Sequence, residues 1–276
     1  MRTEDTHKIL FTDLDGTLFD DEKRVSTEDL TTINEMLNAG HRLVICTGRP
    51  LFSAKVVSRE MGLYRDGIYI AASNGGVIYD CSKEEVIFSR KLSFDTVGLL
   101  FREALKEGLS IHTYTDDNVV SVVETNEIRQ YCARIKMPFK LLDNIPEDLP
   151  KEPPKLIVVS IKENSRQILS DFEERHSDMV KGQAQSVFSN DFLLEYLPIG
   201  SSKGDALERL CELLGIPAEL SVAAGDEAND IPMIQAAGVG AVMQNGTDEA
   251  KSYADYVTKR SNNESGVSEI IRKFIL

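Results

Sequence analysis

Residues 9–18 read ILFTDLDGTL, and this segment decides the fold. It begins as an apolar run of strand-forming residues and ends in two carboxylates and a glycine, as a buried parallel strand does when it stops at a catalytic edge. Residues two apart on an extended chain point the same way, roughly 7 Å from each other, so Asp13 and Asp15 start on one side. Gly16 then permits a turn that brings Asp15 back over Asp13. Two carboxylates aimed at one point repel each other and call for a cation or a shared proton; the alternative is an ordinary Asp-Gly turn.

The composition is that of a globular protein with a large core. The chain has 276 residues, of which 42% are hydrophobic and 28% charged, and this is enough for one large domain or two ordinary ones. The net charge of −14 argues against a nucleic-acid partner, because no basic stripe is present to bind phosphates. The apolar runs are too short for a membrane span, and the polar residues 1–8 are unlike a signal peptide. Four widely spaced cysteines without a CxxC pair favour reduced thiols in a cytoplasmic protein.

Strand and helix signals alternate in the first part of the chain. The apolar runs at 42–46 and 68–72 are expected strands. A helix is expected between the capping residue Ser26 and Gly40, and a second one begins at Pro50. This alternation predicts an α/β fold whose core is a Rossmann-like, doubly wound parallel sheet.

The rhythm changes between residues 85 and 195. This stretch alternates helices with hairpin-like strand pairs and contains a proline-rich connection near residues 146–154, whereas the parallel α/β rhythm resumes afterwards. We therefore expect two domains. Residues 1–84 and 196–276 would form the core domain, and residues 85–195 would form an inserted α+β cap.

Reactive and phosphate-binding residue types follow several of the expected strands. In an open α/β sheet, ligands collect at the carboxyl ends of the strands. Thr47 and Gly48 end the second strand with a hydroxyl and a backbone N–H at a helix start, which suits an anion. A later strand ends in the loop 225–230, GDEAND, which carries further carboxylates, Asp226 and Asp230 among them, and an amide.

These carboxylates indicate a site for a hard cation. Asp13 and Asp226 supply two oxygen ligands, and a backbone carbonyl and waters would complete an octahedron. Mg²⁺ fits this set better than Zn²⁺, which prefers His or Cys. Because the chain is so acidic, a phosphate ligand needs a local cation, and Lys203 is the candidate. Taken one at a time, each feature has an ordinary explanation: Thr47 could cap a helix, and Lys203 and the acidic loop could be exposed to solvent. The occurrence of all of them at strand ends favours a phosphate site.

These residues resemble the motifs of the haloacid dehalogenase superfamily, specifically of its Cof-like, capped sugar-phosphatase branch. Residues 13–18 (DLDGTL) match the first motif, residues 47–50 (TGRP) the second, Lys203 the third and residues 225–230 the fourth. The resemblance covers essentially the whole chain, including an inserted cap between the second and third motifs.

The resemblance implies an Mg²⁺-dependent phosphatase that hydrolyses small-molecule phosphomonoesters, sugar phosphates or related metabolites, through an aspartyl-phosphate. Asp13 would be the nucleophile and Asp15 the general acid and base. Mg²⁺ would be held by Asp13, the Asp15 carbonyl and Asp226. The cap would select the substrate. Phosphate oxygens would be held by Thr47, Gly48, Lys203 and Asn229, with Asp230 supporting the waters of the metal or Lys203.

Three other functions are consistent with parts of this pattern. A phosphosugar mutase of the same superfamily is the nearest alternative, and a product assay would separate it from a phosphatase. A phosphorylated signalling receiver also pairs an aspartate with a Thr and a Lys, but Asp15 and the large insert have no purpose there. An inactive sugar-phosphate binding protein is disfavoured because Asp13 and Asp15 are both present.

Overall fold

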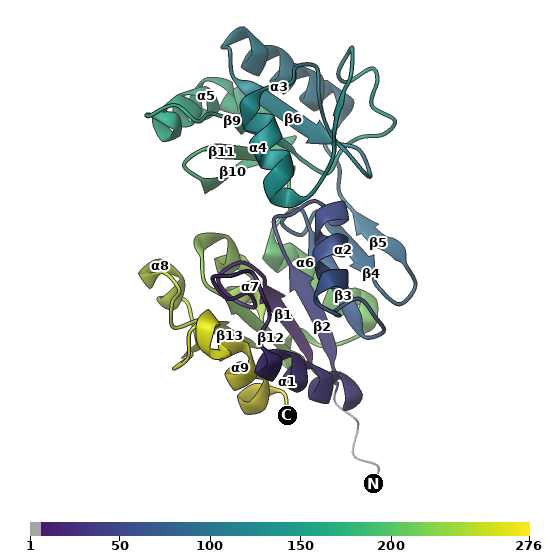
Figure 1. The fold of residues 1–276 in the computed structure, drawn as a ribbon, viewed down its shortest axis with the longest axis vertical. Helices are drawn as coiled ribbons and strands as arrows, with labels where there is room; N and C mark the ends of the chain where they lie inside the picture. The colour runs from purple at the N-terminus through teal and green to yellow at the C-terminus, as the bar shows by residue number, and fades with distance from the viewer. Residues whose placement is uncertain (1–6) are drawn as a thin grey trace. The chain divides into compact units, whose positions relative to one another are not determined.

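The computed structural model describes residues 7–276 (Figure 1). The prediction that the polar residues 1–8 are unlike a signal peptide concerns mostly residues 1–6, which lie outside the described residues. The chain divides into two compact units. The first, called the core unit, comprises Met1–Gly48, Val57–Phe88 and Ser202–Leu276; the second, called the cap unit, comprises Arg49–Val56 and Ser89–Ser201.

The core unit is built on an eight-stranded sheet in the order β14-β13-β12-β1-β2-β3-β4-β5. The neighbours from β14 to β3 run parallel, whereas β3 and β4 form an antiparallel hairpin. The predicted domain boundaries after residues 84 and 195 remain predictions. In the structure, β5 of the core sheet begins after residue 84, and β11 (Leu193–Pro198) of the cap sheet continues past residue 195. The strands of this sheet are β1 (Ile9–Asp13), β2 (Arg42–Cys46), β3 (Ile68–Ala72), β4 (Val77–Asp80), β5 (Glu85–Ser89), β12 (Ser221–Gly225), β13 (Val239–Val242) and β14 (Tyr256–Val257).

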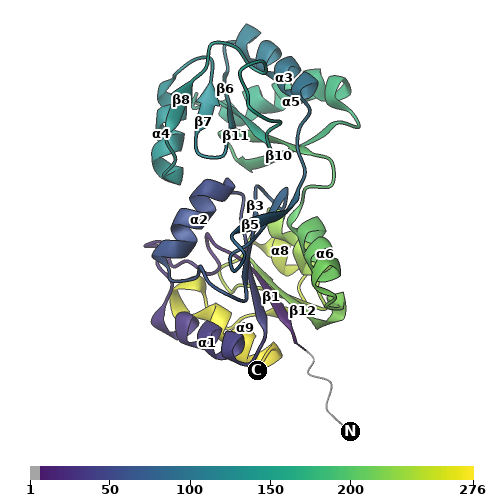
Figure 2. The same ribbon diagram turned by 90° about the vertical axis from the view of Figure 1, so that its right-hand side faces the viewer.

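Helices cover both faces of the core sheet, which confirms the doubly wound α/β fold. Figure 2 shows α1 (Thr27–Asn38) and α9 (Gly266–Phe274) on one side of β1 and β12, and α6 (Lys203–Leu214) on the other. The inner face of α6 and α7 packs on the strands in one buried cluster with Phe11 and Val44. The remaining elements of this part of the sequence are α2 (Leu51–Glu60), η1 (Ala218–Leu220), η2 (Ala228–Asp230), α7 (Ile231–Ala236), α8 (Asp248–Lys251) and η3 (Asn262–Glu264).

Serine caps fix where two of the core helices begin. The Ser26 side chain accepts a hydrogen bond from the Asp29 N–H, as predicted for the start of α1. Ser202 accepts one from the Asp205 N–H and so starts α6 at Lys203. Each cap satisfies an N–H that lacks an intrahelical partner. The second cap therefore places Lys203 at the first position of α6.

The cap unit is an α+β layer, as predicted. Its six-stranded sheet has the order β10-β11-β9-β6-β7-β8. One face packs on α3 (Phe94–Lys106) and α5 (Ser165–Val180), and the other on α4 (Asn126–Ile135), with alternate strand residues contributing to the two clusters. The strands are β6 (Ser110–Tyr114), β7 (Val119–Ser121), β8 (Phe139–Leu141), β9 (Leu156–Val159), β10 (Ala184–Asn190) and β11 (Leu193–Pro198).

The cysteines and the lengths of the helices bear on the sequence-based expectations about thiols and membrane spans. The four cysteines are free thiols and all are buried. Among residues 7–276, no helix combines the length and the apolar character that crossing a membrane requires.

Candidate functional site

Strand β1 carries Asp13 to the edge where the neighbouring parallel strands also end. Asp13 is paired in register with Cys46 at the end of β2. On the other side, Thr12 is paired with Ala224, one residue before the end of β12. Because parallel strands end at the same edge, Asp226, which directly follows β12, is placed beside Asp13.

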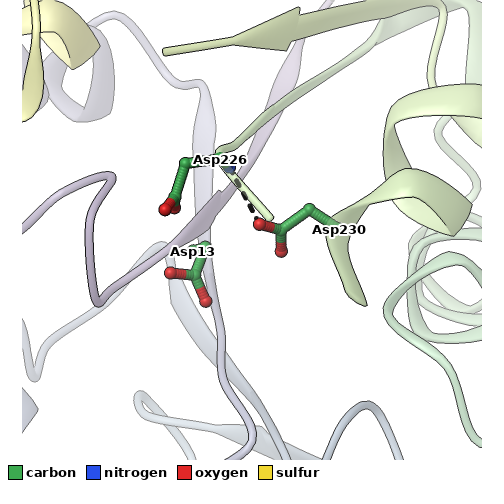
Figure 3. A group of neighbouring side chains, drawn as sticks. All are labelled: Asp13, Asp226 and Asp230. Carbon is green, nitrogen blue, oxygen red and sulfur yellow. Dashed lines mark hydrogen bonds between the residues drawn. The ribbon is translucent and has the colours of Figure 1, made fainter. Parts of the chain in front are cut away.

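Three carboxylates meet at this edge (Figure 3). Asp13, Asp226 and Asp230 each offer an oxygen atom, and these atoms all lie within 4.8 Å of one another. All three residues are buried. The second carboxylate oxygen of Asp230 also accepts hydrogen bonds from the N–H groups of Asp226 (2.9 Å) and Glu227 (3.1 Å), which fixes the loop that carries the cluster.

Lys203 is the counter-charge of this cluster. Its Nζ lies 2.5 Å from an oxygen of Asp13 and 2.5 Å from an oxygen of Asp230. The ammonium group is fully buried, so the alternative of a solvated lysine does not apply. The two contacts tie the end of β1 to the loop after β12 through the first residue of α6.

Burial dominates the protonation of these groups. It raises the pKa of Asp13 to about 8, against the effect of Lys203, while the charges of Asp230 and Asp226 raise this pKa further. It raises the pKa of Asp226 to about 6, against a hydrogen bond from Thr17. Burial acts against the charge of Lys203, but Asp13 and Asp230 outweigh it and raise the lysine pKa well above its usual value. The site therefore holds more carboxylate charge than one lysine balances.

The turn after β1 fits closely against Asp226. Gly16 adopts φ +92°, and a Cβ atom there would lie 2.3 Å from an oxygen of Asp226. The Thr17 hydroxyl donates to the other oxygen of Asp226 at 2.6 Å, and the Asn245 amide donates to the Gly16 carbonyl at 2.8 Å. The sequence-based prediction assigned no role to Thr17 or Asn245. Thr17 could have been found from its place in the same motif, whereas Asn245 carries no such signal.

Asp15 lies apart from the carboxylate cluster. Its side chain is 40% exposed, and one oxygen lies 2.9 Å from the Nζ of Lys23. This position keeps the carboxylate near solvent, where it can exchange protons. The pairing with Lys23 was not foreseen from the sequence, because Lys23 stands in an unremarkable polar turn.

The second motif lies beside the hairpin of β3 and β4. Thr47 is buried and continues the pairing of β2 by donating its N–H to the Ala71 carbonyl at 2.9 Å. The Asn74 N–H donates to the Thr47 carbonyl at 3.1 Å, and a Cβ atom on Gly48 would lie 3.2 Å from the Asn74 amide oxygen. Asn74 therefore borders Gly48. By contrast, Asn229 is exposed on η2, and within residues 7–276 its side chain makes no hydrogen bond to the cluster.

Comparison with known proteins decides the family. A family model described as haloacid dehalogenase-like hydrolase matches residues 10–271. The chain belongs to the haloacid dehalogenase-like hydrolase family. This hydrolase is 28% identical to the 5-amino-6-(5-phospho-D-ribitylamino)uracil phosphatase YwtE of Bacillus subtilis (strain 168), over 97% of this chain and 98% of the relative. It is also 28% identical to the phosphatase YwpJ of the same organism, over 97% of this chain and 100% of the relative.

The structural comparison agrees with this family. The hydrolase matches a crystal structure of a haloacid dehalogenase-like hydrolase from Bacteroides thetaiotaomicron with a TM-score of 0.88 and 29% identity, over 97% of this chain and 99% of the other. The predictions of the superfamily and of the fold are thereby confirmed. The predicted enzyme class, a phosphatase of this superfamily, is confirmed by the family match together with the phosphatase relatives.

The carboxylate cluster of this hydrolase fits a hard divalent cation. Its donor atoms are all carboxylate oxygens, without His or Cys, which suits Mg²⁺ better than Zn²⁺. A divalent ion there would offset the excess negative charge that raises the pKa values of Asp13 and Asp226. The geometry thus brings together Asp13, Asp226, Asp230 and Lys203. Asp15 follows Asp13 by two residues, after the end of β1, and its side chain lies outside this cluster.

Proposed function

We propose that this hydrolase is an Mg²⁺-dependent phosphatase that acts on small-molecule phosphomonoesters through an aspartyl-phosphate on Asp13. The observation that supports it most is that Asp13, at the end of β1, lies 2.5 Å from the Lys203 ammonium group and within 4.8 Å of a carboxylate oxygen of Asp226. A nucleophile for a phosphate dianion needs adjacent positive charge, and this edge of the sheet offers both a lysine and a fitting cation site.

In the first step, an oxygen of Asp13 attacks phosphorus and the bond from phosphorus to the ester oxygen breaks. The leaving alcohol takes a proton from Asp15, whose side chain is accessible to solvent and so can be reprotonated. The product of this step is the free alcohol and a phosphoryl group on Asp13. One difficult displacement is thereby divided into two easier ones.

In the second step, a water molecule attacks the phosphorus of the phospho-aspartate. Asp15, now deprotonated, accepts the proton of this water, and the bond between phosphorus and the Asp13 oxygen breaks. Inorganic phosphate leaves and both aspartates return to their starting states. The same side chain therefore serves as acid and then as base.

The proposed cation and Lys203 have separate electrostatic roles. When bound by Asp13, Asp226 and the Asp15 carbonyl, Mg²⁺ would supply charge neutralisation between the nucleophile and the phosphate. Lys203 favours the anionic form of Asp13 against the effect of burial, and Asp230 fixes Lys203 by its ion pair. Further contacts to the phosphate oxygens are assigned to Thr47, Gly48 and Asn229; the last requires a movement of its exposed side chain.

The proposed substrates are sugar phosphates or related metabolites. The name of the YwtE relative gives a phosphorylated ribitylamino-uracil as the substrate of that protein. Esters whose organic part contains a nitrogen heterocycle should therefore also be tested. The net charge of −14 makes small anions, attracted by a local site, better candidates than a nucleic-acid polymer.

A panel of phosphate esters tests this proposal. Released inorganic phosphate is measured with Mg²⁺ and with a chelator, for the wild type and for Asp13→Asn. We expect turnover of at least one small ester that needs Mg²⁺ and is lost in the variant. Turnover in the presence of the chelator, or by the variant at the wild-type rate, would contradict the proposal. Conversion of a sugar phosphate to an isomer without free phosphate would point instead to a mutase.

A further inference from the structure

The chain folds tightly on itself between residues 20 and 24, a segment called the lysine turn. The Asp20 N–H donates to the Arg24 carbonyl at 2.9 Å, which closes the turn. The carboxylate of Asp20 also accepts hydrogen bonds from the N–H groups of Glu22 (2.9 Å) and Arg24 (2.8 Å). An aspartate that binds the backbone of its own turn restricts the conformations available to that turn. The lysine turn therefore has a defined backbone, although most of it is exposed.

Lys23 adopts a left-handed backbone conformation in this turn, with φ +61°. This region suits glycine or asparagine, whereas other residues lose stability there. Such residues persist where the surrounding structure fixes them, and they occur often at functional sites. The Lys23 N–H donates to the Asp20 carbonyl at 3.0 Å, so the turn itself holds the strained residue. The backbone thus keeps a lysine at a position where a glycine would cause no strain.

A segment from the C-terminal part of the chain fixes the backbone on both sides of this region. The Asn262 amide donates to the carbonyl of Phe19, directly before the lysine turn, at 2.9 Å. The Asn262 N–H donates to the side chain of Asn245 at 2.9 Å. Asn245 in turn donates to the carbonyl of Gly16, the residue after Asp15. The backbone beside Asp15 and the backbone beside the lysine turn are therefore held by one connected set of hydrogen bonds.

The lysine turn directs an ammonium group at the proposed acid and base of the reaction. Nζ of Lys23 lies 2.9 Å from an oxygen of Asp15, and the two side chains are 59% and 40% exposed. An ion pair this exposed contributes little to stability, because solvent weakens the attraction and both side chains lose conformational freedom. Stability therefore does not explain why a strained lysine stands here. The contact does limit the positions that the Asp15 carboxylate takes.

The proposed mechanism needs the Asp15 carboxylate at a specific place. In an in-line displacement, the leaving oxygen lies on the far side of phosphorus from the attacking oxygen of Asp13. A general acid must approach that leaving oxygen to about 2.6–3.2 Å to transfer its proton. Asp15 therefore has to lie apart from Asp13, with room for a phosphoryl group between them. Its side chain is outside the carboxylate cluster and in contact with Lys23, as this requires.

We propose that Lys23 is a positioning residue, which holds the Asp15 carboxylate where it reaches the leaving oxygen of the ester and, afterwards, the attacking water. The proposal rests on the phosphatase function proposed above. Lys23 itself takes no part in proton transfer and does not contact the substrate. Its loss should therefore affect only the steps that depend on Asp15.

Two esters of similar size separate these steps. Benzyl phosphate releases an alkoxide, which needs the proton of Asp15, whereas nitrophenyl phosphate releases a phenolate that leaves without it. Lys23→Met should lower kcat for benzyl phosphate at least about tenfold, which is part of the roughly 10²–10⁴-fold effect of positioned proton transfer, and should leave KM nearly unchanged. The rate constant of the first nitrophenol release, measured by stopped flow, should stay within about twofold of the wild type.

A double-mutant cycle tests whether Lys23 acts through Asp15. The cycle uses hydrolysis of the phospho-aspartate, measured as phosphate release after the nitrophenol burst, because this step needs Asp15 as a base. Lys23→Met should slow it at least about tenfold when Asp15 is present. In the Asp15→Asn background the same change should have less than about a twofold effect, because the group to be positioned is already replaced.

Three variants serve as controls. Lys23→Arg keeps the positive charge and should retain kcat for benzyl phosphate within about threefold of the wild type. Lys23→Gly fits the left-handed backbone and should be at least as stable in urea as the wild type, but should lose as much kcat as Lys23→Met. Lys259→Met removes the same charge from another exposed lysine of the core unit and should leave kcat unchanged.

The outcomes separate this role from the proposed function. Mg²⁺-dependent hydrolysis with equal losses for the two esters in Lys23→Met, or full activity of Lys23→Gly on benzyl phosphate, overturns the positioning role while the phosphatase function stands. An equal effect of Lys23→Met in both backgrounds of the cycle also overturns this role, because Lys23 would then act independently of Asp15. Absence of Mg²⁺-dependent hydrolysis of any ester by the wild type overturns the phosphatase function, and the positioning role with it.

Discussion

Replacement of Lys203 by methionine removes an ammonium group that contacts both Asp13 and Asp230. Methionine keeps most of the length and volume of the side chain, so the loss of charge is isolated from the loss of packing. In the described structure, Nζ lies 2.5 Å from both Asp13 and Asp230, and the ammonium group is fully buried. The variant would leave these carboxylates buried without their shared counter-charge.

Two magnitudes follow from this geometry. Removing one partner of a buried ion pair costs about 3–5 kcal/mol of folding free energy, because the remaining charge is uncompensated. Removing one preorganised donor from a site of developing charge costs about 2.7–4 kcal/mol of transition-state stabilisation, which corresponds to a loss of about 10²–10³ in kcat. Lys203→Met should therefore be both less stable and far less active, provided that folding is verified at the assay temperature.

Lys155 provides a matched control in the cap unit. It is also fully buried, and its Nζ lies 2.8 Å from Glu195. Lys155→Met should show a comparable loss of stability in urea, because it removes the ammonium group that neutralises a buried carboxylate. Its kcat for a small phosphate ester with Mg²⁺ should fall far less than that of Lys203→Met. Equal losses of kcat in the two variants, or a kcat of Lys203→Met within roughly tenfold of the wild type, would refute the assigned role of Lys203.

Three further changes test the surroundings of the site. Gly16→Ala should weaken the apparent Mg²⁺ affinity in a metal titration, because the new Cβ would lie 2.3 Å from an Asp226 oxygen; an unchanged affinity would contradict this. Asp15→Asn should impair hydrolysis of alkyl esters much more than the first step with nitrophenyl phosphate, since nitrophenolate leaves without a proton, and stopped-flow kinetics should show a nitrophenol burst. Burial lowers the pKa of His112 to about 3, so the unfolded chain, with a pKa near 6.5, binds a proton that the native state does not between these values. The contribution of the neutral, buried His112 to the free energy of unfolding is present above about pH 6.5. It is lost as the pH falls, by up to about 1.4 kcal/mol per pH unit. Urea unfolding at pH 7 and pH 5 should therefore show a smaller pH dependence for His112→Phe than for the wild type.

Local signals in the sequence predict the part of the candidate site that lies at the ends of β1 and β12. The apolar run before Asp13, the serine before α1 and the loop after β12 each have a sequence pattern that follows from backbone geometry. Because parallel strands end at one edge, the strand order alone places Asp226 beside Asp13. The need for a local cation made Lys203 a candidate, and the family resemblance assigned it to the third motif; in the structure its side chain contacts both Asp13 and Asp230.

Long-range contacts explain what the sequence did not reveal. The pairing of Asp15 with Lys23 depends on the path of a turn, and a lysine in a polar turn is normally solvated. Asn245 reaches the Gly16 carbonyl from a segment 229 residues away. Asn229 remains exposed, because η2 is fixed through the carboxylate of Asp230 rather than through this amide.

The most direct measurement concerns a phosphoryl group on Asp13. The Asp15→Asn variant is mixed with nitrophenyl phosphate and Mg²⁺, quenched during the burst and reduced with borohydride, which converts an aspartyl-phosphate to homoserine. Peptide mass spectrometry then locates the modified residue. The proposed mechanism predicts homoserine at position 13, and its absence when Mg²⁺ is chelated. Homoserine at position 226 or 230, or a burst of nitrophenol with no modified aspartate, would contradict the assignment of Asp13 as the nucleophile.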